Sequence, residues 1–346
     1  MSATPDQRAE SPATPAKPVE VAVPNHAQDD AAAARDHGSS ARYEISELEV
    51  TGTAPETAMV DVMGGQVRQQ IDVHDHGFVA LVDAMPRLVP EGHTADAAIV
   101  QAARVSYGAG TKKVNEDRGL IRYLLRHRHT TPFEMVEFKF HMAMPIFVAR
   151  QWIRHRTANV NEYSARYSIL PDRFYRPSAD AVRKQSTSNR QGGDARFDVG
   201  DDAQVRTAQD YLGYLDKAEA LYAEYTDLSE RGVSRELARA ALPTSIYTEW
   251  YWKCDLHNIL RFLSLRMDPH AQQEIRDYAF AMYRLIEPIV PMSVEAFGDY
   301  EIEAMHLTKL EIEAIKSLGA GGDGSLASSN KREQAEWVEK RGRLGL

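Results

Sequence analysis

The segment from Arg150 to Arg176 combines residue types that can bind an anion. It carries six arginines, no lysine and two acids, within a chain of 346 residues whose formal net charge is −9. A guanidinium group forms planar, two-pronged hydrogen bonds to phosphate that a lysine ammonium cannot match. Between these arginines lie polar side chains able to contact a small molecule, namely Asn159, Asn161, Glu162, Ser164 and Tyr167. The pattern therefore predicts a binding site for an anionic small molecule.

Four arginines are the main candidates for holding that anion: Arg154, Arg156, Arg166 and Arg239. The alternative is structural ion pairing, for which the 50 acidic residues of the chain offer many partners. The residue types alone leave both roles open.

Cysteine, serine and histidine could support other chemistries. Cys254 lies in a run of large apolar residues with only Lys253 to activate it, which favours a buried hydrophobic role over a nucleophilic thiolate. No His/Asp arrangement marks Ser164 as activated, so we expect it to bind ligand. No metal site is predicted, because His127 and His129 stand two apart and no cysteine cluster accompanies them.

Composition bounds the class of protein. The length allows one large domain or two ordinary ones, and 43% hydrophobic residues are typical of a globular protein. No apolar run reaches the length of a membrane span, and the N-terminus lacks the apolar core of a signal peptide. One cysteine excludes an intramolecular disulfide and predicts a cytoplasmic location. The acidic balance argues against general nucleic-acid binding.

The chain divides into four parts by composition. Residues 1–42 are rich in Ala, Pro, Asp and Ser and are predicted to form a disordered arm. Residues 43–70 form an ambiguous extension in which Ile45, Leu48 and Val50 alternate with polar residues, as in a short strand. The main domain is predicted over 71–315. Residues 316–346 are expected to be a flexible tail that ends in a short charged helix.

Hydrophobic spacing predicts mainly helices around the candidate residues. The segments with helical spacing are 77–85, 97–105, 117–128 and the region from 203 onward, including 246–267. A further helix is predicted through Ile289, with Asp268 as its N-cap and Pro269 as its first residue.

The clearest strand signal is the alternation of apolar and polar residues over 136–142. Pro145 then suits the first position of a helix that would deliver Arg154, His155 and Arg156 at its C-terminal end. The polar stretch 178–201 is expected to be a long surface loop. Together these elements predict an α+β fold, with helices packed on a small antiparallel sheet.

Several motifs together resemble the flavin-dependent (alternative) thymidylate synthases. One is Arg154-His155-Arg156 followed, after seven residues, by Ser164-Ala165-Arg166. The others, in the same order along the chain, are His129 to Glu134, Pro145 to Trp152, Arg239 to Pro243, and Leu265-Arg266 with His270 to Gln272. The resemblance spans roughly residues 71–300.

The resemblance implies a role for each matching residue. Deoxyuridine monophosphate (dUMP) would be contacted by Gln151, Trp152, Ile153, Arg154, Glu162, Tyr163, Ser164, Ala165, Arg166, Arg239 and Arg266. Flavin adenine dinucleotide (FAD) would be contacted by Thr131, Arg154, His155, Arg156, Glu162, Asp255, Leu256, His257 and Arg261. His129 would lie near the flavin or the folate. Arg266 would be the catalytic residue, because a guanidinium against the pyrimidine favours ionisation at N3.

Two features of this chain differ from the family pattern. Ala165 stands where members often have glycine, and Asp255, His257 and Arg261 stand where some members have Asn or Arg. The chain has no Gly-x-Gly-x-x-Gly fingerprint, which agrees with a family whose FAD is held between subunits by arginines and helix ends.

The reaction implied by the resemblance is reductive methylation of dUMP to thymidylate. 5,10-Methylenetetrahydrofolate would donate the carbon, FAD would carry the hydride and NADPH would be the reductant, with release of tetrahydrofolate. A homotetramer with active sites at subunit interfaces is also implied. Two other classes stay open at this point: a nucleotide-binding flavoprotein with a different reduction, and a non-enzymatic RNA-binding module, which the acidic composition disfavours.

Overall fold

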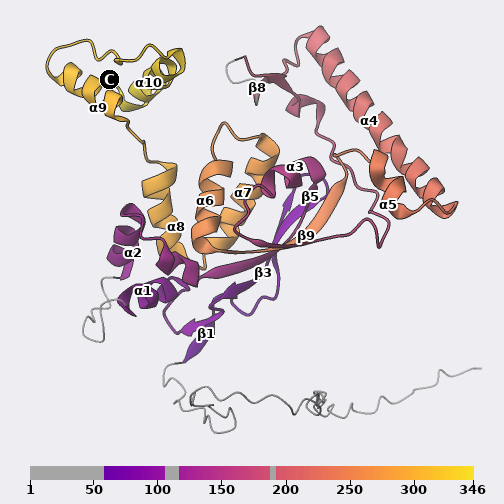
Figure 1. Ribbon diagram of the computed structural model, residues 1–346, viewed down its shortest axis with the longest axis horizontal. Helices are drawn as coiled ribbons and strands as arrows, with labels where there is room; N and C mark the ends of the chain where they lie inside the picture. Colours follow the sequence, from indigo (N-terminus) through magenta and orange to yellow (C-terminus); the bar gives the residue numbers. More distant parts are fainter. Residues whose placement is uncertain (1–57, 106–116, 188–191) are drawn as a thin grey trace, which may run out of the picture. The chain divides into compact units, whose positions relative to one another are not determined.

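The centre of the protein is a five-stranded antiparallel sheet with strand order β2-β3-β5-β9-β6. The computed structural model describes residues 58–105, 117–187 and 192–346 (Figure 1). The strands of the sheet are β2 (Gln69–Val73), β3 (Gly77–Met85), β5 (Glu137–Pro145), β6 (Asn159–Glu162) and β9 (Tyr247–Asp255). Two short ribbons lie outside it: β1 (Met59–Asp61) with β4 (Leu88–Pro90), and β7 (Arg183–Gln185) with β8 (Gly193–Arg196). The predicted α+β class is confirmed.

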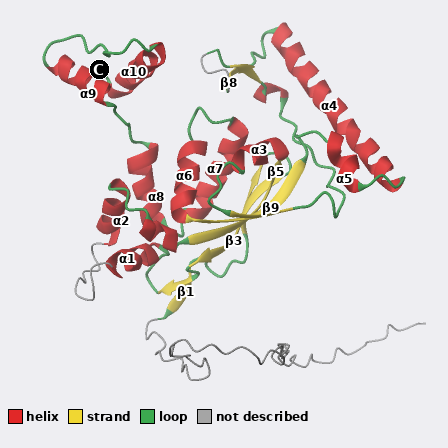
Figure 2. Ribbon diagram, in the orientation of Figure 1, coloured by secondary structure: helices red, strands yellow, loops and turns green. Residues whose placement is uncertain are grey.

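Helices make up most of the remaining described structure (Figure 2). The α-helices are α1 (Asp96–Val105), α2 (Asp117–Arg126), α3 (Ile146–Trp152), α4 (Asp202–Glu230), α5 (Arg235–Ala238), α6 (Leu256–Arg266), α7 (Gln273–Ile286), α8 (Pro291–Phe297), α9 (Lys309–Gly319) and α10 (Lys331–Leu344). Shorter helical turns are η3 (Thr131–Met135), η4 (Ala179–Ala181), η5 (Arg239–Ala241) and the π-helical η6 (Gly298–Ile302). None of the described helices is long and apolar enough to cross a membrane.

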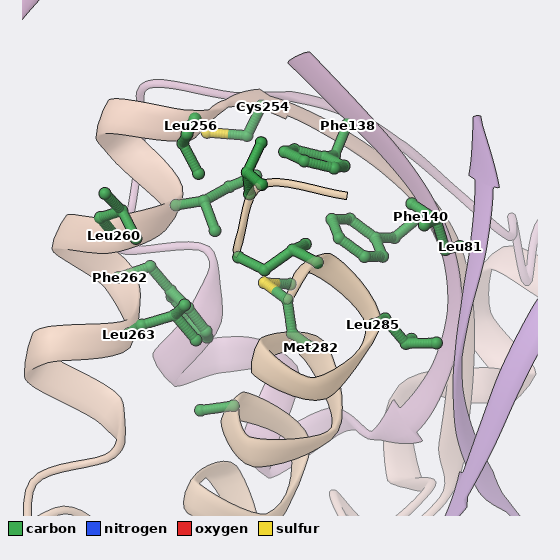
Figure 3. Close-up of a cluster of buried hydrophobic side chains, with 14 of the residues drawn as sticks. Leu81, Phe138, Phe140, Cys254, Leu256, Leu260, Phe262, Leu263, Met282 and Leu285 are labelled. Atoms are coloured by element: carbon green, nitrogen blue, oxygen red, sulfur yellow. The ribbon is translucent and has the colours of Figure 1, made fainter. Parts of the chain in front are cut away.

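The main core lies between the sheet and helices α6 and α7. Side chains alternate along β5, so that Phe138 and Phe140 point to the same buried face. Figure 3 shows these rings in one cluster of buried side chains with Phe262 of α6 and Met282 of α7. Each fully buried side chain of this size contributes roughly 1.5–3 kcal/mol of hydrophobic stabilisation. The core therefore fixes α6, and with it Arg266, against the sheet.

Two segments predicted as helical are strands. Residues 77–85 form β3, which pairs with β2 on one side and β5 on the other. Val79, Ala80 and Leu81 are all fully buried, so β3 lacks the alternation that marks a half-exposed strand. The segment 246–267 is divided between β9 and α6. In β9 the buried residues Trp250, Trp252 and Cys254 occur at every second position, which is strand spacing.

Three helix boundaries differ from the predictions. The helix after Pro145 ends at Trp152, so Arg154, His155 and Arg156 follow it in a turn. Asp268 does not cap α7, which begins at Gln273 and ends at Ile286. Its carboxylate instead accepts a 2.7 Å hydrogen bond from the backbone N–H of His270, within a separate turn. The helix predicted over 117–128 ends at Arg126.

The surface segment 178–201 contains η4 and the β7–β8 ribbon, although we predicted a loop. The charged helix predicted near the C-terminus is present as α10, and its Trp337 is buried with its indole N–H donating to the carbonyl of Gly324. The predicted arm 1–42 and the strand near Ile45 lie outside the described residues. The divisions at 42, 70 and 315 stay predictions.

Replacing Gly77 by alanine should destabilise the protein. A Cβ at this position would overlap the Tyr278 hydroxyl and lie 2.6 Å from the carbonyl oxygen of Val73. We expect Gly77→Ala to lower the free energy of unfolding by roughly 1–3 kcal/mol in urea titrations. The control is Gly119→Ala in α2, where a Cβ meets nothing within 4 Å and helix propensity predicts unchanged or slightly higher stability. Equal stability of the two variants would contradict this description of the β2–β3 turn.

Candidate functional site

Arg266 and His155 form a hydrogen-bonded pair at the end of α6. Arg266 is the last residue of this helix, and its Nε donates to Nε2 of His155 at 3.1 Å. His155 follows α3, and its backbone N–H donates to the carbonyl of Trp152 at 2.9 Å. The imidazole also meets the ring of Phe262 edge-on, with centroids 4.9 Å apart. Two elements that are far apart in the sequence therefore position one guanidinium.

The hydrogen bond requires that Nε2 of His155 carry no proton. Burial, with the charges of Arg266 and Arg261 acting in the same direction, lowers the pKa of His155 to about 4. Burial also lowers the pKa of Arg266, but from a value so high that the guanidinium stays charged. The pair is thus a cation beside a neutral acceptor, and the guanidinium keeps its other N–H groups for a ligand.

Arg166 and Arg239 share a cleft of about 540 Å³ at the end of β6. Arg239 begins η5, and Arg166 follows the strand by four residues. Glu162 is held there by its Oε1, which accepts a 2.7 Å hydrogen bond from Thr248 of β9. The cleft is also lined by Tyr163, Ser164, Ala165 and Tyr167. Two guanidinium groups beside a carboxylate and hydroxyls form a donor and acceptor set that suits a phosphorylated polar molecule.

His129 and Arg261 line a different cavity, of about 270 Å³, between α2, η3 and α6. Its floor is apolar, with Leu124, Leu260 and Phe297, and its other lining residues include His257 and Arg128. Apolar side chains beside two arginines, with Glu301 also in the lining, can accommodate part of an anionic, aromatic group such as a flavin dinucleotide. Among the predicted FAD contacts, His257 and Arg261 lie here.

The remaining predicted residues are exposed, or buried in ways that limit their contacts. Ile153, Arg154, Arg156 and Thr131 are exposed, and Gln151 is hydrogen-bonded to the side chain of Gln272. Asp255 caps α6 by accepting from the backbone N–H of Asn258 at 2.9 Å. Trp152 and Leu256 are fully buried, so in this chain they offer a ligand no side-chain surface.

The predicted substrate residues therefore lie in separate places. The cleft with Arg166 and Arg239 does not contain Arg266, and neither does the cavity with His129 and Arg261. Sequence reasoning missed Thr248 and Arg128. Thr248 reaches Glu162 through the register that pairs β9 with β6, and Arg128, whose backbone is left-handed with φ 58°, lines the cavity with His129. Gln272 carried a signal, because it belongs to the His270–Gln272 motif.

Cys254 is buried in β9, as predicted, but in a strand where we expected a helix (Figure 3). Its Sγ donates a 3.2 Å hydrogen bond to the carbonyl of Thr157. Burial raises the pKa of the thiol, with Asp255 adding to the effect. The thiol therefore stays protonated, which agrees with a hydrophobic role and not with a nucleophile.

Comparison with known proteins gives one consistent answer. The sequence model of the family described as thymidylate synthase complementing protein matches residues 87–292. A flavin-dependent thymidylate synthase from Dictyostelium discoideum is 61% identical over 304 residues, which cover 88% of this chain and 97% of that protein. One from Wolbachia pipientis wMel is 48% identical over 266 residues, which cover 76% of this chain and 89% of that protein.

A solved structure is similar as well. The UMP/dUMP methylase PolB from Streptomyces cacaoi, bound with 5-Br dUMP, superposes with a TM-score of 0.56 at 32% identity, covering 67% of this chain and 98% of that chain. The fold and the arginine-rich site thus define an enzyme of the class that acts on nucleotides. The chain belongs to the flavin-dependent thymidylate synthase family, so the resemblance seen in its motifs is confirmed.

The His155 pair should make stability depend on pH. The folded pKa of about 4 lies below the ordinary value of 6.5, so the unfolded chain binds this proton first as the pH falls. The contribution of neutral His155 to the free energy of unfolding is fully present above pH 6.5 and is lost as the pH falls from 6.5 to 4. Allowing for solvent screening of a half-buried group, it amounts to about 1–2 kcal/mol.

The measurement is the free energy of unfolding from pH 7 to pH 4.5, for the wild type and for His155→Gln. Glutamine can accept the hydrogen bond but cannot titrate, so the variant should lose less stability over this range. Parallel curves would show that His155 has no lowered pKa.

Proposed function

We propose that this enzyme catalyses the reductive methylation of dUMP to thymidylate, with 5,10-methylenetetrahydrofolate as carbon donor, FAD as hydride carrier and NADPH as reductant. The observation that carries the proposal is the cleft in which Arg166 and Arg239 lie beside Glu162 and Ser164. Support comes from relatives named flavin-dependent thymidylate synthase and from a neighbour bound to 5-Br dUMP. The product folate is tetrahydrofolate, because the two electrons that reduce the methylene group come from NADPH through the flavin.

The substrate phosphate binds Arg166 and Arg239. Two guanidinium groups can form up to four hydrogen bonds to the phosphate oxygens and balance most of its charge. Ser164 and the backbone around Tyr163 and Ala165 continue the nucleotide contact. Glu162 accepts a hydrogen bond from the ligand while the Thr248 hydroxyl donates to its Oε1. Gln151, Trp152, Ile153 and Arg154 complete the dUMP contacts, Trp152 through its backbone, since its ring is buried.

Arg266 is the catalytic residue. Its guanidinium lies against the pyrimidine and stabilises the anion formed when N3 loses its proton. Negative charge spreads from N3 through the ring and makes C5 a better carbon nucleophile, without a covalent bond to the enzyme. His155 stays neutral, so it holds the guanidinium without competing for the anion. The C5 proton leaves once the methylene carbon is attached.

FAD would be held by Thr131, Arg154, His155, Arg156, Glu162, Asp255, Leu256, His257 and Arg261, and His129 would lie near the flavin or the folate. When bound, FAD supplies the hydride that converts the transferred methylene into a methyl group. His257 and Arg261 would bind its anionic part, and the apolar side chains of their cavity would help to exclude water from the bound group. Asp255 and Leu256 shape the start of α6, through the N-cap and the core respectively.

The active enzyme is a homotetramer whose sites combine residues of different subunits. The support is the separation within one chain between the Arg166 cleft and the Arg266–His155 pair. A nucleotide that needs both groups can reach them together if a second copy brings its own Arg266 to the cleft. The oligomer is therefore part of the catalytic site in this proposal.

Arg266→Ala should abolish turnover while leaving the flavin bound. We expect release of tritium from [5-³H]dUMP, with NADPH and methylenetetrahydrofolate, to fall by about 10²- to 10³-fold, because one preorganised donor to the developing anion is lost. Flavin absorbance of the purified variant should be unchanged. Cys254→Ala is the control and should keep most of the activity. Full activity of Arg266→Ala would overturn the proposed chemistry. So would a Cys254→Ala variant that folds normally but releases no tritium.

Shared sites can be tested by mixing two inactive variants. Arg239→Ala and Arg266→Ala are each expected to be inactive, but each carries the residue that the other lacks. After dissociation and random reassembly, about a quarter of the sites would hold both arginines, if these come from different subunits. Recovery of about that share of wild-type tritium release is the expected result. No recovery from well-mixed oligomers would place both arginines of a site on one chain.

A further inference from the structure

Helix α4 is much longer than its contact with the rest of the chain requires. It runs through 29 residues, of which only Ala208 and Tyr225 are buried. The Tyr222 hydroxyl donates 2.6 Å to the carbonyl of Leu170, and the Tyr225 hydroxyl accepts from the backbone N–H of the same residue. Asp216 also forms an ion pair with Arg176. The opposite side of the helix is open to solvent along its length (Figure 1).

Three large apolar side chains form a stripe along one flank of α4. Tyr214, Leu221 and Leu228 are 64%, 37% and 36% exposed, and they follow one another at intervals of seven residues. Seven residues are close to two helical turns, so the three side chains lie in a line. We call this line the α4 seam.

Charges of alternating sign run beside the seam at the same interval. They are Asp210, Lys217, Glu224 and Arg231, all exposed. Arg231 pairs with Asp227 within the helix, whereas no described residue forms an ion pair with Lys217 or Glu224. Solvation alone does not favour a charge that changes sign at every step of seven residues along a helix face. The pattern has the form of the edge charges that specify helix pairing.

We propose that the α4 seam is a docking surface for the same helix of a second copy of this chain, packed antiparallel about a two-fold axis at Leu221. In this arrangement Leu221 meets its own copy, and Tyr214 meets the partner's Leu228. Lys217 then faces the partner's Glu224, and Asp210 faces the partner's Arg231. Every charged pair along the seam is complementary.

The pattern favours a second copy over an unrelated protein. A two-fold contact must be complementary to itself when reversed, and the charge order −, +, −, + becomes +, −, +, − on reversal. A parallel pair in the same register would set like charges side by side, which is unfavourable. A partner of different sequence places no such symmetry on α4. The proposal rests on the self-association proposed above and assigns one surface to it.

The pairing would also bring substrate clefts of two subunits into one assembly. Helix α4 contacts α5 and the η5 turn, whose first residue is Arg239. Fixing α4 against its copy therefore restrains the turn that carries one of the two phosphate-binding arginines.

A cysteine crosslink tests the two-fold axis directly. The only native cysteine, Cys254, is buried, so a Cys254→Ser background gives a full-length chain without other thiols. Leu221→Cys in that background should give a disulfide-linked dimer under mild oxidation, since an axis at this residue brings the two Cα atoms to within about 4–7 Å. Ala223→Cys, exposed on a different face of the same helix, is the matched control and should stay uncrosslinked.

Charge reversal tests the register. Lys217→Glu places a glutamate opposite the partner's Glu224 in both symmetry-related pairs. On dilution, we expect the variant to dissociate at a concentration roughly 5- to 10-fold higher than the wild type does. The double variant Lys217→Glu, Glu224→Lys restores both pairs and should return to within about twofold of wild type. Sedimentation velocity on the full chain measures both. A surface role unrelated to pairing would not predict this rescue.

The outcomes separate this inference from the proposed function. An active tetramer in which Leu221→Cys forms no crosslink, or in which the double reversal fails to rescue, overturns the α4 pairing and leaves the chemistry standing. A monomer with full turnover overturns both the pairing and the shared sites. Crosslinking of Leu221→Cys and Ala223→Cys to the same extent would also overturn the pairing, because it indicates collision and not a defined axis.

Discussion

The pairing of β9 between β5 and β6 is the constraint on which the rest of the site depends. One face of β9 buries Trp250, Trp252 and Cys254 under the helices, and this fixes the register of the strand to the core. The same register sets Thr248 beside Glu162 and so shapes the Arg166 cleft. β9 then leads without a loop into α6, whose last residue is Arg266. A slip of one residue would turn the three buried side chains to the other face and move both functional groups.

The electrostatics of the site follow from burial as much as from charge. His155 lies against Phe262 and beside two arginines, so its protonated form is disfavoured and it acts as a neutral acceptor. The net charge of −9 does not describe this region, where arginines without lysine are concentrated between residues 150 and 176. The proposed anion site thus depends on the local composition of a turn and an edge strand, within a protein whose overall composition is acidic.

The sequence named candidate site residues through short motifs, and the family that these motifs indicate is confirmed. The Arg154-His155-Arg156 run, Arg239 and Arg266 were named in this way and their roles stay predictions, whereas the predicted burial of Cys254 is confirmed. The fold was harder to predict where the physical signal is ambiguous. β3 is buried on both faces, so Val79, Ala80 and Leu81 show no alternation that would distinguish a strand from a helix.

Contacts that depend on strand register or join distant segments of the chain could not be predicted from the sequence. The bond from Arg266 to His155 joins residues 111 positions apart, and Thr248 reaches Glu162 across 86. The same limit explains why the predicted substrate residues could be named together although one chain holds them in separate places. In the proposed homotetramer, residues of one motif set could come from different subunits, which a single sequence does not specify.

The central claim is that Arg266, held by a neutral His155, stabilises dUMP ionised at N3. ¹⁵N NMR of dUMP labelled at N3 and bound to the flavin-loaded enzyme tests it most directly. The account predicts the chemical shift of a deprotonated N3 near neutral pH in the wild type, and that of a protonated N3 in Arg266→Ala under saturating dUMP. A protonated N3 in the wild-type complex, or a deprotonated one in the variant, would contradict it.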